Sequence, residues 1–358
     1  MVNYHYSVSD FTYHQLLAGK WEKNLLPVLT HGGGGDFDER VVASPFVLLL
    51  GNGEKVLYFM GQDKNRSKWG VGVAFSDDLK KWVKYKDNPV FNQDMIKWGK
   101  KIDGPFIIEK DEKYYLFYES SSSPHYLYSI QEKIRSCRLD FIFKSRIAKK
   151  ALKLFCDFGI SQAVVHTKDR AIGFAVSKDG LTWKENSDNP ILSKAKIEGW
   201  ESYGVFAPKV YFHNGVYFMY YSASDGKKIS SGLAFSEDLI KWEKYKKNPI
   251  LIAGLKGEWD ERCAEIISII KIKDGFVLFY EGEDGKNCYR IGMAYSRDLV
   301  TWIKAENNPI VDIGRIGKFD DKSILAPHVV AIGDSLYLYY SAFDNEGNGS
   351  IGLAEFRN

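Results

Sequence analysis

Two acidic residues interrupt apolar stretches of the sequence. Asp103 lies in I-D-G-P-F-I-I, and Glu265 lies in C-A-E-I-I-S-I-I. Charged side chains are costly to bury and are found in apolar surroundings mainly when they are paired or have a chemical task. Two carboxyl groups in different surroundings can divide the work of acid–base catalysis, because burial raises the pKa of one while the other stays ionised. Asp103 and Glu265 are therefore the first candidates for a catalytic pair.

A repeated phrase indicates which elements position these two acids. It reads Ser-x-Asp, an optional Gly, Leu, Trp, and then Asn-Pro with an aliphatic residue, and it occupies residues 76–90, 177–191, 236–250 and 296–310. Trp follows Ser by six positions and Pro follows Trp by seven in every copy. The tryptophans at 82, 183, 242 and 302 give a period of about 60 residues, with about 41 additional residues in the first interval. Such fixed spacing indicates four copies of one structural unit.

Each unit has the pattern of four antiparallel strands. A Gly-containing apolar run precedes the phrase, the Trp opens a further strand, and two more strands lie upstream, joined in the third copy by the hairpin signal Asn214-Gly215. Such units repeated radially form a β-propeller. A fifth unit near the C-terminal end lacks its outer strand, and residues 20–29 resemble that strand. We predict an all-β fold, a five-bladed β-propeller of four-stranded antiparallel blades closed by the N-terminal strand.

The additional residues of the first interval predict an insertion in the second blade, at about residues 124–170. Part of it, residues 132–157, holds eight basic and three acidic residues. Apolar residues at helical spacing with lysines opposite predict a partly helical insertion. Packing on the propeller, a lid over the axial pocket, an oligomer contact and a membrane-surface helix are the alternatives for its role. Residues 1–358 otherwise fit a single propeller domain.

Composition excludes several classes of protein. The net charge of +3 gives no case for nucleic-acid binding. The sequence has no apolar run near the roughly 18 residues of a transmembrane segment and no signal-peptide pattern at its start, so we expect a cytoplasmic protein. The four cysteines lack the spacing of a metal site, and we expect no metal or other cofactor.

The first strands of the blades should converge on the axis of the propeller. They can be aligned on the Pro of each strand, or on Ile267 in the fourth blade. The residues two positions earlier are Ala43, Asp103, Phe206, Glu265 and Leu325. We therefore expect the two acids to face one axial cavity. Hydrogen bonding of either carboxyl group to loop amides is the alternative.

An aromatic residue followed by an acid opens four of the five blades. The acids are Asp38, Glu201, Asp260 and Asp320. This recurrence favours a structural role in the loop. Asp38 and Glu201 are nevertheless also candidates for the site.

Residues 205–222, followed by S-G-L-A-F-S-E-D-L-I-K-W, resemble the five-bladed propeller glycoside hydrolases. These are the arabinanases and xylosidases of family 43 and the fructosidases of families 32 and 68. The resemblance covers essentially the whole chain through its repeat, and it is specific for the fold rather than the substrate. It implies a catalytic Asp on the first blade, a second Asp that sets pKa and orientation, and a Glu general acid.

The resemblance assigns roles to particular residues. Asp103 is similar to the second Asp and Glu265 to the general acid. The family places its first Asp directly before the Pro of blade one, where this sequence has Ser44. Asp38 or Asp36, a few residues upstream, could take that place. We predict Asp38, Asp103 and Glu265 as catalytic residues.

The implied function is hydrolysis of an oligo- or polysaccharide by paired carboxyl groups in the axial pocket. The residues expected to contact the carbohydrate are Asp36, Phe206, Glu201, Arg262 and His328. A phosphorylase like the related family 130 enzymes is one alternative, and its phosphate would need basic residues such as Arg40, Arg262, Arg290 or His328. The other alternative, motivated by Ser44, is a carbohydrate-binding propeller without turnover.

Overall fold

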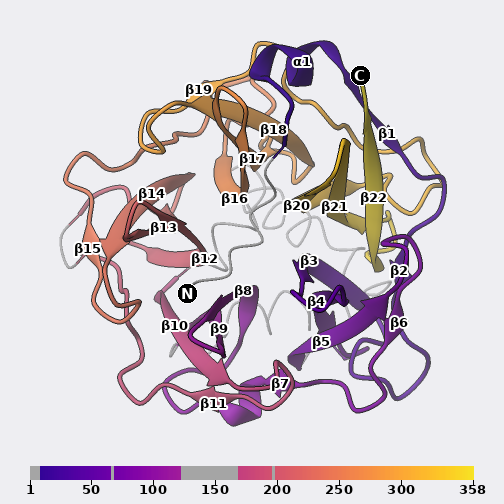
Figure 1. Cartoon of the computed structure of the whole chain (residues 1–358), viewed down its shortest axis with the longest axis vertical. Coiled ribbons are helices and arrows are strands. Elements are labelled where there is room, and N and C mark those ends of the chain that lie inside the picture. Colours follow the sequence, from indigo (N-terminus) through magenta and orange to yellow (C-terminus); the bar gives the residue numbers. More distant parts are fainter. Residues whose placement is uncertain (1–8, 66–67, 122–167, 196–197) are drawn as a thin grey trace, which may run out of the picture.

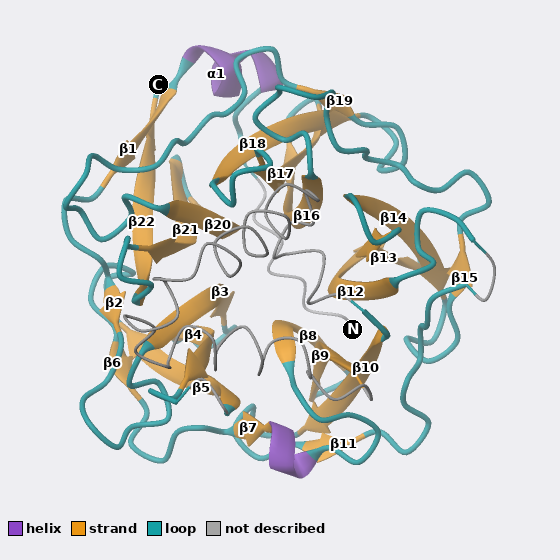
Figure 2. Cartoon of the chain, turned by 180° about the vertical axis from the view of Figure 1, so that it is seen from behind, coloured by secondary structure: helices purple, strands orange, loops and turns teal. Residues whose placement is uncertain are grey.

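The computed structural model describes residues 9–65, 68–121, 168–195 and 198–358. Within these residues the strands form five antiparallel units arranged around a common centre (Figure 1). We call these units blades one to five, in chain order. The view from behind shows the same ring (Figure 2). The predicted all-β fold is confirmed, and the arrangement of its strands is that of a propeller.

Each blade begins with the strand nearest the centre. Blade one contains β3 (Val41–Leu49), β4 (Lys55–Gln62), β5 (Trp69–Ser76), β6 (Val83–Lys84) and β7 (Phe91–Asn92). Blade two contains β8 (Asp103–Lys110), β9 (Lys113–Ser121), β10 (Arg170–Ser177) and β11 (Lys184–Glu185). Blade three contains β12 (Gly204–His213), β13 (Val216–Ser224), β14 (Ile229–Ser236) and β15 (Glu243–Lys244). Blade four contains β16 (Cys263–Ile272), β17 (Gly275–Glu283), β18 (Tyr289–Ser296) and β19 (Ile303–Lys304). Blade five contains β20 (Ser323–Ile332), β21 (Ser335–Phe343) and β22 (Gly349–Arg357).

The first strands form a continuous ring around the centre. β3 packs beside β8, β8 beside β12, β12 beside β16, β16 beside β20, and β20 beside β3 (Figure 1). Apolar side chains fill the space between neighbouring blades, and the fully buried ones include Phe59, Phe117, Met219, Leu278 and Leu338. Burial of this apolar surface is the main term that holds the blades together.

The N-terminal segment completes blade five. β1 (Lys20–Lys23) pairs antiparallel with β22, with Trp21 opposite Phe356. β2 (Leu29–Thr30) continues along the same strand, with Leu29 opposite Ile351. The predicted pairing of this segment with the last blade is therefore confirmed. The short helix α1 (Tyr13–Ala18), which precedes β1, was not predicted.

The Ser and Asp of the repeated phrase build the turn after the third strand of a blade. In blade three, Ser236 Oγ accepts the N–H groups of Asp238 and Leu239 at 3.2 and 2.9 Å. Asp238 Oδ1 accepts the N–H groups of Ile240 and Lys241, both at 2.8 Å. Leu239 has a φ of 74°, in the left-handed region, which explains why the second copy carries Gly at this place.

The Asn of the phrase links the outer edge of the blade to the third strand. Asn248 Nδ2 donates to Leu233 O and its Oδ1 accepts from Leu233 N, both at 2.9 Å. The same amide also donates to the Tyr221 hydroxyl at 3.1 Å. Equivalent pairs of backbone hydrogen bonds occur at Asn88, Asn189 and Asn308. This geometry accounts for the fixed distance from Trp to Asn-Pro.

The acid that opens a blade forms an ion pair with the lysine two positions after the outer Trp. In blade four, Lys304 Nζ lies 2.5 Å from Asp260 Oδ2, which also accepts the Tyr280 hydroxyl at 3.2 Å. The equivalent pairs are Asp38–Lys84 at 2.5 Å, Glu201–Lys244 at 2.6 Å and Asp320–Lys23 at 2.6 Å. In these four blades the acid therefore ties the loop before the first strand to the outer strand, in keeping with the structural role expected for it.

The predicted insertion lies almost entirely outside the described residues. Its last residue, Arg170, is the first residue of β10, one position earlier than the strand start expected from sequence. Among the residues that the structure describes, no helix has the length and apolar character needed to cross a membrane.

Candidate active site

A cavity of about 770 Å³ lies where the first strands of the five blades converge. Four of the five aligned positions line it, namely Asp103, Phe206, Glu265 and Leu325. Ala43 is buried beside it without lining it. The expectation that Asp103 and Glu265 share one axial cavity agrees with this placement.

The first strands are irregular at the point where they line the cavity. Each loses register with its neighbour there, between Ala43 and Phe46 in blade one and at the equivalent places in the other blades. Ser44, Ala207 and Ala326 have φ values of 50°, 49° and 51°, in the region that side chains with a Cβ rarely adopt. Such β-bulges re-aim side chains and are common beside active sites.

In blade two, the axial acid Asp103 lies opposite Glu119 of β9. Glu119 is buried, pairs with Arg170 Nη1 and accepts the backbone N–H of Ala207 in blade three. The other terminal nitrogen of Arg170 lies 3.9 Å from Asp103 Oδ2, and the guanidinium also lies over the Phe206 ring. Arg170 therefore presents a positive charge to the carboxyl group that faces the cavity.

In blade four, Glu265 lies opposite Glu281 of β17. Glu281 accepts the backbone N–H of Ala326 in blade five at 2.7 Å. Burial, and next the charge of Glu281, raise the pKa of Glu265 well above its ordinary value. Burial also raises the pKa of Glu281, to about 7, against the effect of the Ala326 hydrogen bond. The cavity therefore holds a carboxyl group whose surroundings favour the protonated form that a general acid requires.

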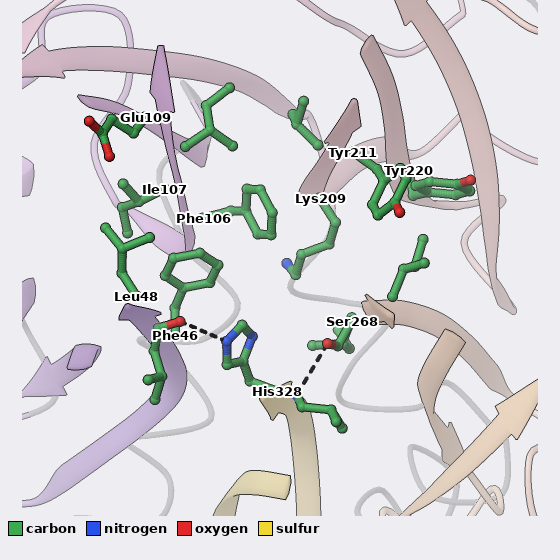
Figure 3. Close-up of a pocket in the computed structure, with 16 residues that line it drawn as sticks. Phe46, Leu48, Phe106, Ile107, Glu109, Lys209, Tyr211, Tyr220, Ser268 and His328 are labelled. Carbon is green, nitrogen blue, oxygen red and sulfur yellow. Dashed lines mark hydrogen bonds between the residues drawn. The ribbon is translucent and has the colours of Figure 1, made fainter. Parts of the chain in front are cut away.

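Three side chains directly after the irregularity of a first strand line the cavity. They are Phe46, Lys209 and His328, which also line a second pocket, drawn in Figure 3. His328 Nε2 donates to Val47 O at 3.1 Å, and burial lowers the pKa of His328 to about 4, so its imidazole is neutral. Burial lowers the pKa of Lys209 to about 8, against the attraction of Glu265, Glu281 and other acids.

Basic and aromatic side chains complete the walls. Lys101 and Trp69 line the cavity together, with the Lys101 ammonium 4.9 Å from the Trp69 ring. Burial lowers the pKa of Lys101 to about 8. Arg40 and Tyr289 also line it. Aromatic faces beside charged and polar groups are typical of sites that bind polar organic ligands.

One group of side chains has the spacing of metal ligands. Ligand atoms of Cys263, Glu265 and Glu281 lie within 4.8 Å of one another. A metal ion requires deprotonated ligands. Burial raises the pKa of all three groups, that of the Cys263 thiol and of Glu265 well above their ordinary values. A metal ion bound here would therefore have to displace protons from these groups.

Two predicted site residues lie elsewhere. Asp38 was predicted as catalytic and Glu201 as substrate-binding, but neither lines the cavity. Both are buried acids held by the lysine of an outer strand, as described above. Their place in the repeat explains this, because four blades need an acid there for the same ion pair. We therefore do not assign Asp38 or Glu201 to the site.

Of the other residues predicted to contact the carbohydrate, some line the cavity and others lie outside it. Phe206 and His328 line the cavity, whereas Asp36 and Arg262 do not. Asp36 is exposed and accepts the Gly33 N–H at 2.8 Å within its own turn. Arg262 lies 3.8 Å from Glu261. Of the other basic candidates for phosphate, Arg40 lines the cavity, and Arg290 is paired with Asp284 and Asp312 outside it.

Sequence analysis missed Arg170 and Lys209 as site residues. Lys209 follows the Pro of its first strand, and the same alignment one position after that Pro gives Phe46, Phe106, Lys209, Ser268 and His328. A lysine among these inward positions was therefore a usable signal. Arg170 had none, because it is the last residue of the predicted insertion and pairs with acids far away in the sequence.

The fold and part of the sequence match known carbohydrate-active proteins. Residues 129–256 match the β-1,4-mannooligosaccharide phosphorylase family, glycoside hydrolase family 130. One similar solved structure is described under the statement that the family 130 mannoside phosphorylases contain glycoside hydrolases that target β-1,2-mannosidic linkages in Candida mannan. Its TM-score is 0.61 at 17% identity, and the match covers 94% of this chain and 93% of that one. A thermostable family 43 glycoside hydrolase has a TM-score of 0.59 at 17% identity, with 91% of both chains covered.

The chain has the fold of the five-bladed propeller glycoside hydrolases and phosphorylases. The resemblance to this superfamily inferred from the sequence is confirmed.

Two curated proteins of Thermoanaerobacter sp. (strain X514) are similar to part of the chain. The β-1,2-mannobiose phosphorylase is 32% identical over 32% of this chain and 43% of its own length. The 1,2-β-oligomannan phosphorylase is 31% identical over 33% of this chain and 43% of its own length. The matched part thus spans less than half of either relative. Both relatives are named as phosphorylases.

Proposed function

We propose that this protein cleaves a glycosidic bond of a mannoside in the axial cavity. The observation that carries the proposal is the presence of Asp103 and Glu265, from blades two and four, in one cavity with different surroundings. Burial raises the pKa of Glu265 well above its ordinary value, whereas Asp103 is half-buried beside the Arg170 guanidinium. The mannoside is supported by the family 130 match and by the names of the curated relatives.

The chemistry follows from these surroundings. Glu265 donates its proton to the glycosidic oxygen as the bond from that oxygen to the anomeric carbon breaks. In hydrolysis, the oxygen of a water molecule forms the new bond to the anomeric carbon, and Asp103 accepts the proton of that water. Ser44, which stands where the superfamily has its first Asp, lines the cavity but supplies no charge. Asp103 is therefore the carboxylate partner of Glu265 in this proposal.

Phosphorolysis is the second candidate, because basic groups converge on the same cavity. Lys101, Arg170 and Lys209 all line it, and each is a suitable partner for a dianion. In that reaction a phosphate oxygen, instead of water, bonds to the anomeric carbon. The curated relatives are named as phosphorylases, which favours this candidate over a non-catalytic carbohydrate-binding propeller.

A product assay separates the candidates. The protein is incubated with β-1,2- and β-1,4-linked manno-oligosaccharides, with and without inorganic phosphate. Mannose release without phosphate indicates hydrolysis, whereas mannose 1-phosphate formed only with phosphate indicates phosphorolysis. Binding without either product would contradict the proposed catalysis.

The Glu265→Gln variant tests the assigned acid. It keeps the shape of the side chain but cannot donate a proton to the leaving oxygen. General acid catalysis contributes about 10²–10⁴-fold, so we expect a loss of that size on an unactivated mannoside. An activated aryl mannoside needs little protonation and should lose much less. Asp103→Asn should reduce turnover of both substrates. Wild-type turnover of the unactivated substrate by Glu265→Gln would show that Glu265 is not the acid.

A further inference from the structure

The acids of blades two and four are arranged in the same way. In each blade an axial acid, Asp103 or Glu265, lies opposite a glutamate of the second strand. Each of these glutamates accepts a backbone N–H from the next blade, Glu119 from Ala207 and Glu281 from Ala326. The residues that face the equivalent axial positions in the other blades are Met60, Ser222 and Ser341. The second-strand glutamate is therefore a feature of the two blades that carry an axial acid.

The two arrangements differ in the charge that faces them. In blade two the Arg170 guanidinium pairs directly with Glu119. In blade four no ion pair to Glu281 is formed among the described residues, and ligand atoms of Glu265 and Glu281 lie within 4.8 Å of each other. Two carboxyl groups this close inside a protein do not ionise together. The pair in blade four should therefore retain one proton at neutral pH.

The hydrogen bond from Ala326 decides which member of the pair keeps the proton. Its N–H group donates to Glu281 at 2.7 Å, from a backbone conformation with a φ of 51°. A hydrogen bond to a carboxylate favours the charged form of that group. Glu281 should thus carry the negative charge, and the proton belongs on Glu265.

We propose that Glu281 is a positioning residue, which the Ala326 N–H holds as a carboxylate opposite Glu265, and that it keeps Glu265 protonated for its role as the acid. The catalytic consequence rests on the proposed function, but the charge relationship does not. The resemblance to known hydrolases gave the task of setting the pKa of the acid to Asp103. In this structure Glu281, on the second strand of the blade that carries Glu265, has the larger effect on the acid. Its charge raises the pKa of Glu265 more than the charge of Asp103 does.

Several other charged or titratable groups face Glu265. They are Cys263 of the same strand, Lys209 of β12, Arg170 of β10, Asp103 of β8 and Tyr289 of β18. Lys209 and Arg170 favour the ionised form of Glu265 and oppose Glu281. Removal of the Glu281 charge therefore leaves Glu265 with an excess of positive neighbours, and its pKa should fall.

The experiment follows the titration of Glu265 directly. Carbon-13 NMR of carboxyl-labelled glutamate, with the Glu265 signal assigned by its absence in Glu265→Gln, is recorded for the wild type and for Glu281→Gln. Gln can still accept the Ala326 N–H but carries no charge. We expect the pKa of Glu265 to fall by about one unit or more, the interaction expected of strongly coupled sites. Glu119→Gln, the equivalent change in blade two, is the matched control and should shift the titration of Glu265 much less, because Glu119 acts on Glu265 only through Arg170.

A second variant protects the test against misfolding. Glu281→Ser places at this position the residue type that blades three and five carry, and Ser341 Oγ accepts the Ser44 N–H at 2.7 Å in the same role. Unchanged titration of Glu265 in both folded variants would overturn the proposal. An equal shift in Glu119→Gln would also overturn it, because the effect would then not be specific to the facing pair.

The pH profile of kcat/KM for mannoside cleavage separates this inference from the proposed function. If Glu265 is the acid, the basic limb of the profile should move to lower pH in Glu281→Gln by the same amount as the NMR titration. A shifted titration with an unmoved profile would support the positioning role of Glu281 and contradict the acid role of Glu265.

Discussion

Asp103 and Glu265 occupy equivalent positions in blades two and four. Each lies just before the irregularity of its first strand, and each faces the cavity opposite a buried glutamate. The repeat thus places two carboxyl groups at equivalent positions beside one cavity. Their differences arise from neighbours, because Arg170 stands beside Asp103 while Glu281 faces Glu265. The division into an acid and a carboxylate is therefore set by side chains outside the repeated phrase.

The Asp38→Asn variant distinguishes a structural acid from a catalytic one. Asp38 Oδ2 lies 2.5 Å from Lys84 Nζ, and its side chain is only 2% exposed. We expect the free energy of unfolding to fall by about 1–3 kcal/mol, the cost of leaving a buried polar group poorly paired. Turnover per folded molecule should stay at the wild-type level. Chemical denaturation and mannoside cleavage measure the two effects.

Asp103→Asn serves as the opposite control, with little change in stability and a large loss of turnover. If Asp38→Asn instead lost turnover without losing stability, Asp38 would have to be returned to the catalytic site.

The repeat, and with it the fold, could be predicted from the sequence because short-range hydrogen bonds determine its spacing. The Ser, Asp and Asn of the phrase make hydrogen bonds within about fifteen residues of themselves, so their spacing is conserved along the chain. Glu265 could be predicted in the same way, as a charged residue at an inward position of an aligned strand. The structure places Asp38 outside the cavity and beside Lys84, in line with the structural role that the recurrence of this acid favours.

The charge environment of the cavity could not be predicted, because it depends on contacts between residues far apart in the sequence. Arg170 meets Glu119 within blade two across 51 positions of sequence, and Glu281 of blade four meets Ala326 of blade five across 45. No local pattern encodes either distance. These contacts arise only in the folded ring, and they set the charges that face the two carboxyl groups.

Arg170→Met should destabilise the protein strongly. The side chains of Arg170 and Glu119 are 10% and 4% exposed, so the variant leaves a buried carboxylate without its counter-ion. Breaking a buried ion pair in this way costs about 3–5 kcal/mol. Urea denaturation gives the change in the free energy of unfolding. Lys68→Met is the matched control, because Lys68 and Asp94 are 68% and 65% exposed and an exposed pair contributes about 0–1 kcal/mol.

The double variant Arg170→Met/Glu119→Leu removes both charges. It should recover much of the lost stability, because the unpaired buried charge is gone. Equal destabilisation by Arg170→Met and Lys68→Met would show that the pair of blade two contributes no more than a surface pair.

The lowered pKa of His328 predicts that the folded protein loses stability in mild acid. Its pKa is lowered to about 4 in the folded protein, mainly by burial, whereas an unfolded histidine has a pKa of about 6.5. Between these values the unfolded chain binds the additional proton, so the contribution of His328 is complete above about pH 6.5 and is lost as the pH falls toward 4. His328→Gln retains an N–H donor for Val47 O but does not titrate.

Unfolding free energies of the wild type and His328→Gln at pH 7.5 and pH 5 test this prediction. The wild type should lose more stability over this interval than the variant. The other histidines are common to both proteins and cancel in the comparison. Equal losses would mean that His328 is not held neutral in the folded state.

The strand β1 should contribute substantially to the stability of the whole ring. Trp21 packs against the rings of Phe279 and Phe356, with centroids 5.8 and 5.3 Å away. Lys23 provides the ion pair that the lysine of the outer strand supplies in blades one, three and four, at 2.6 Å from Asp320. Removal of residues 1–30 should therefore expose the edge of β22, leave Asp320 without its lysine and lower the melting temperature.

A smaller change tests the same relationship without truncation. Trp21→Ala should lower the free energy of unfolding by about 3 kcal/mol, near the lower end for large-to-small changes because Trp21 is only partly buried. Leu25→Ser, at a residue that is 81% exposed between β1 and β2, is the control and should have almost no effect. A synthetic peptide of residues 12–30 added to the truncated protein should raise its melting temperature again, because mass action stabilises a folded state that binds the peptide. An unchanged melting temperature on deletion would show that blade five is stable without β1, and that the pairing with β22 does not hold the ring together.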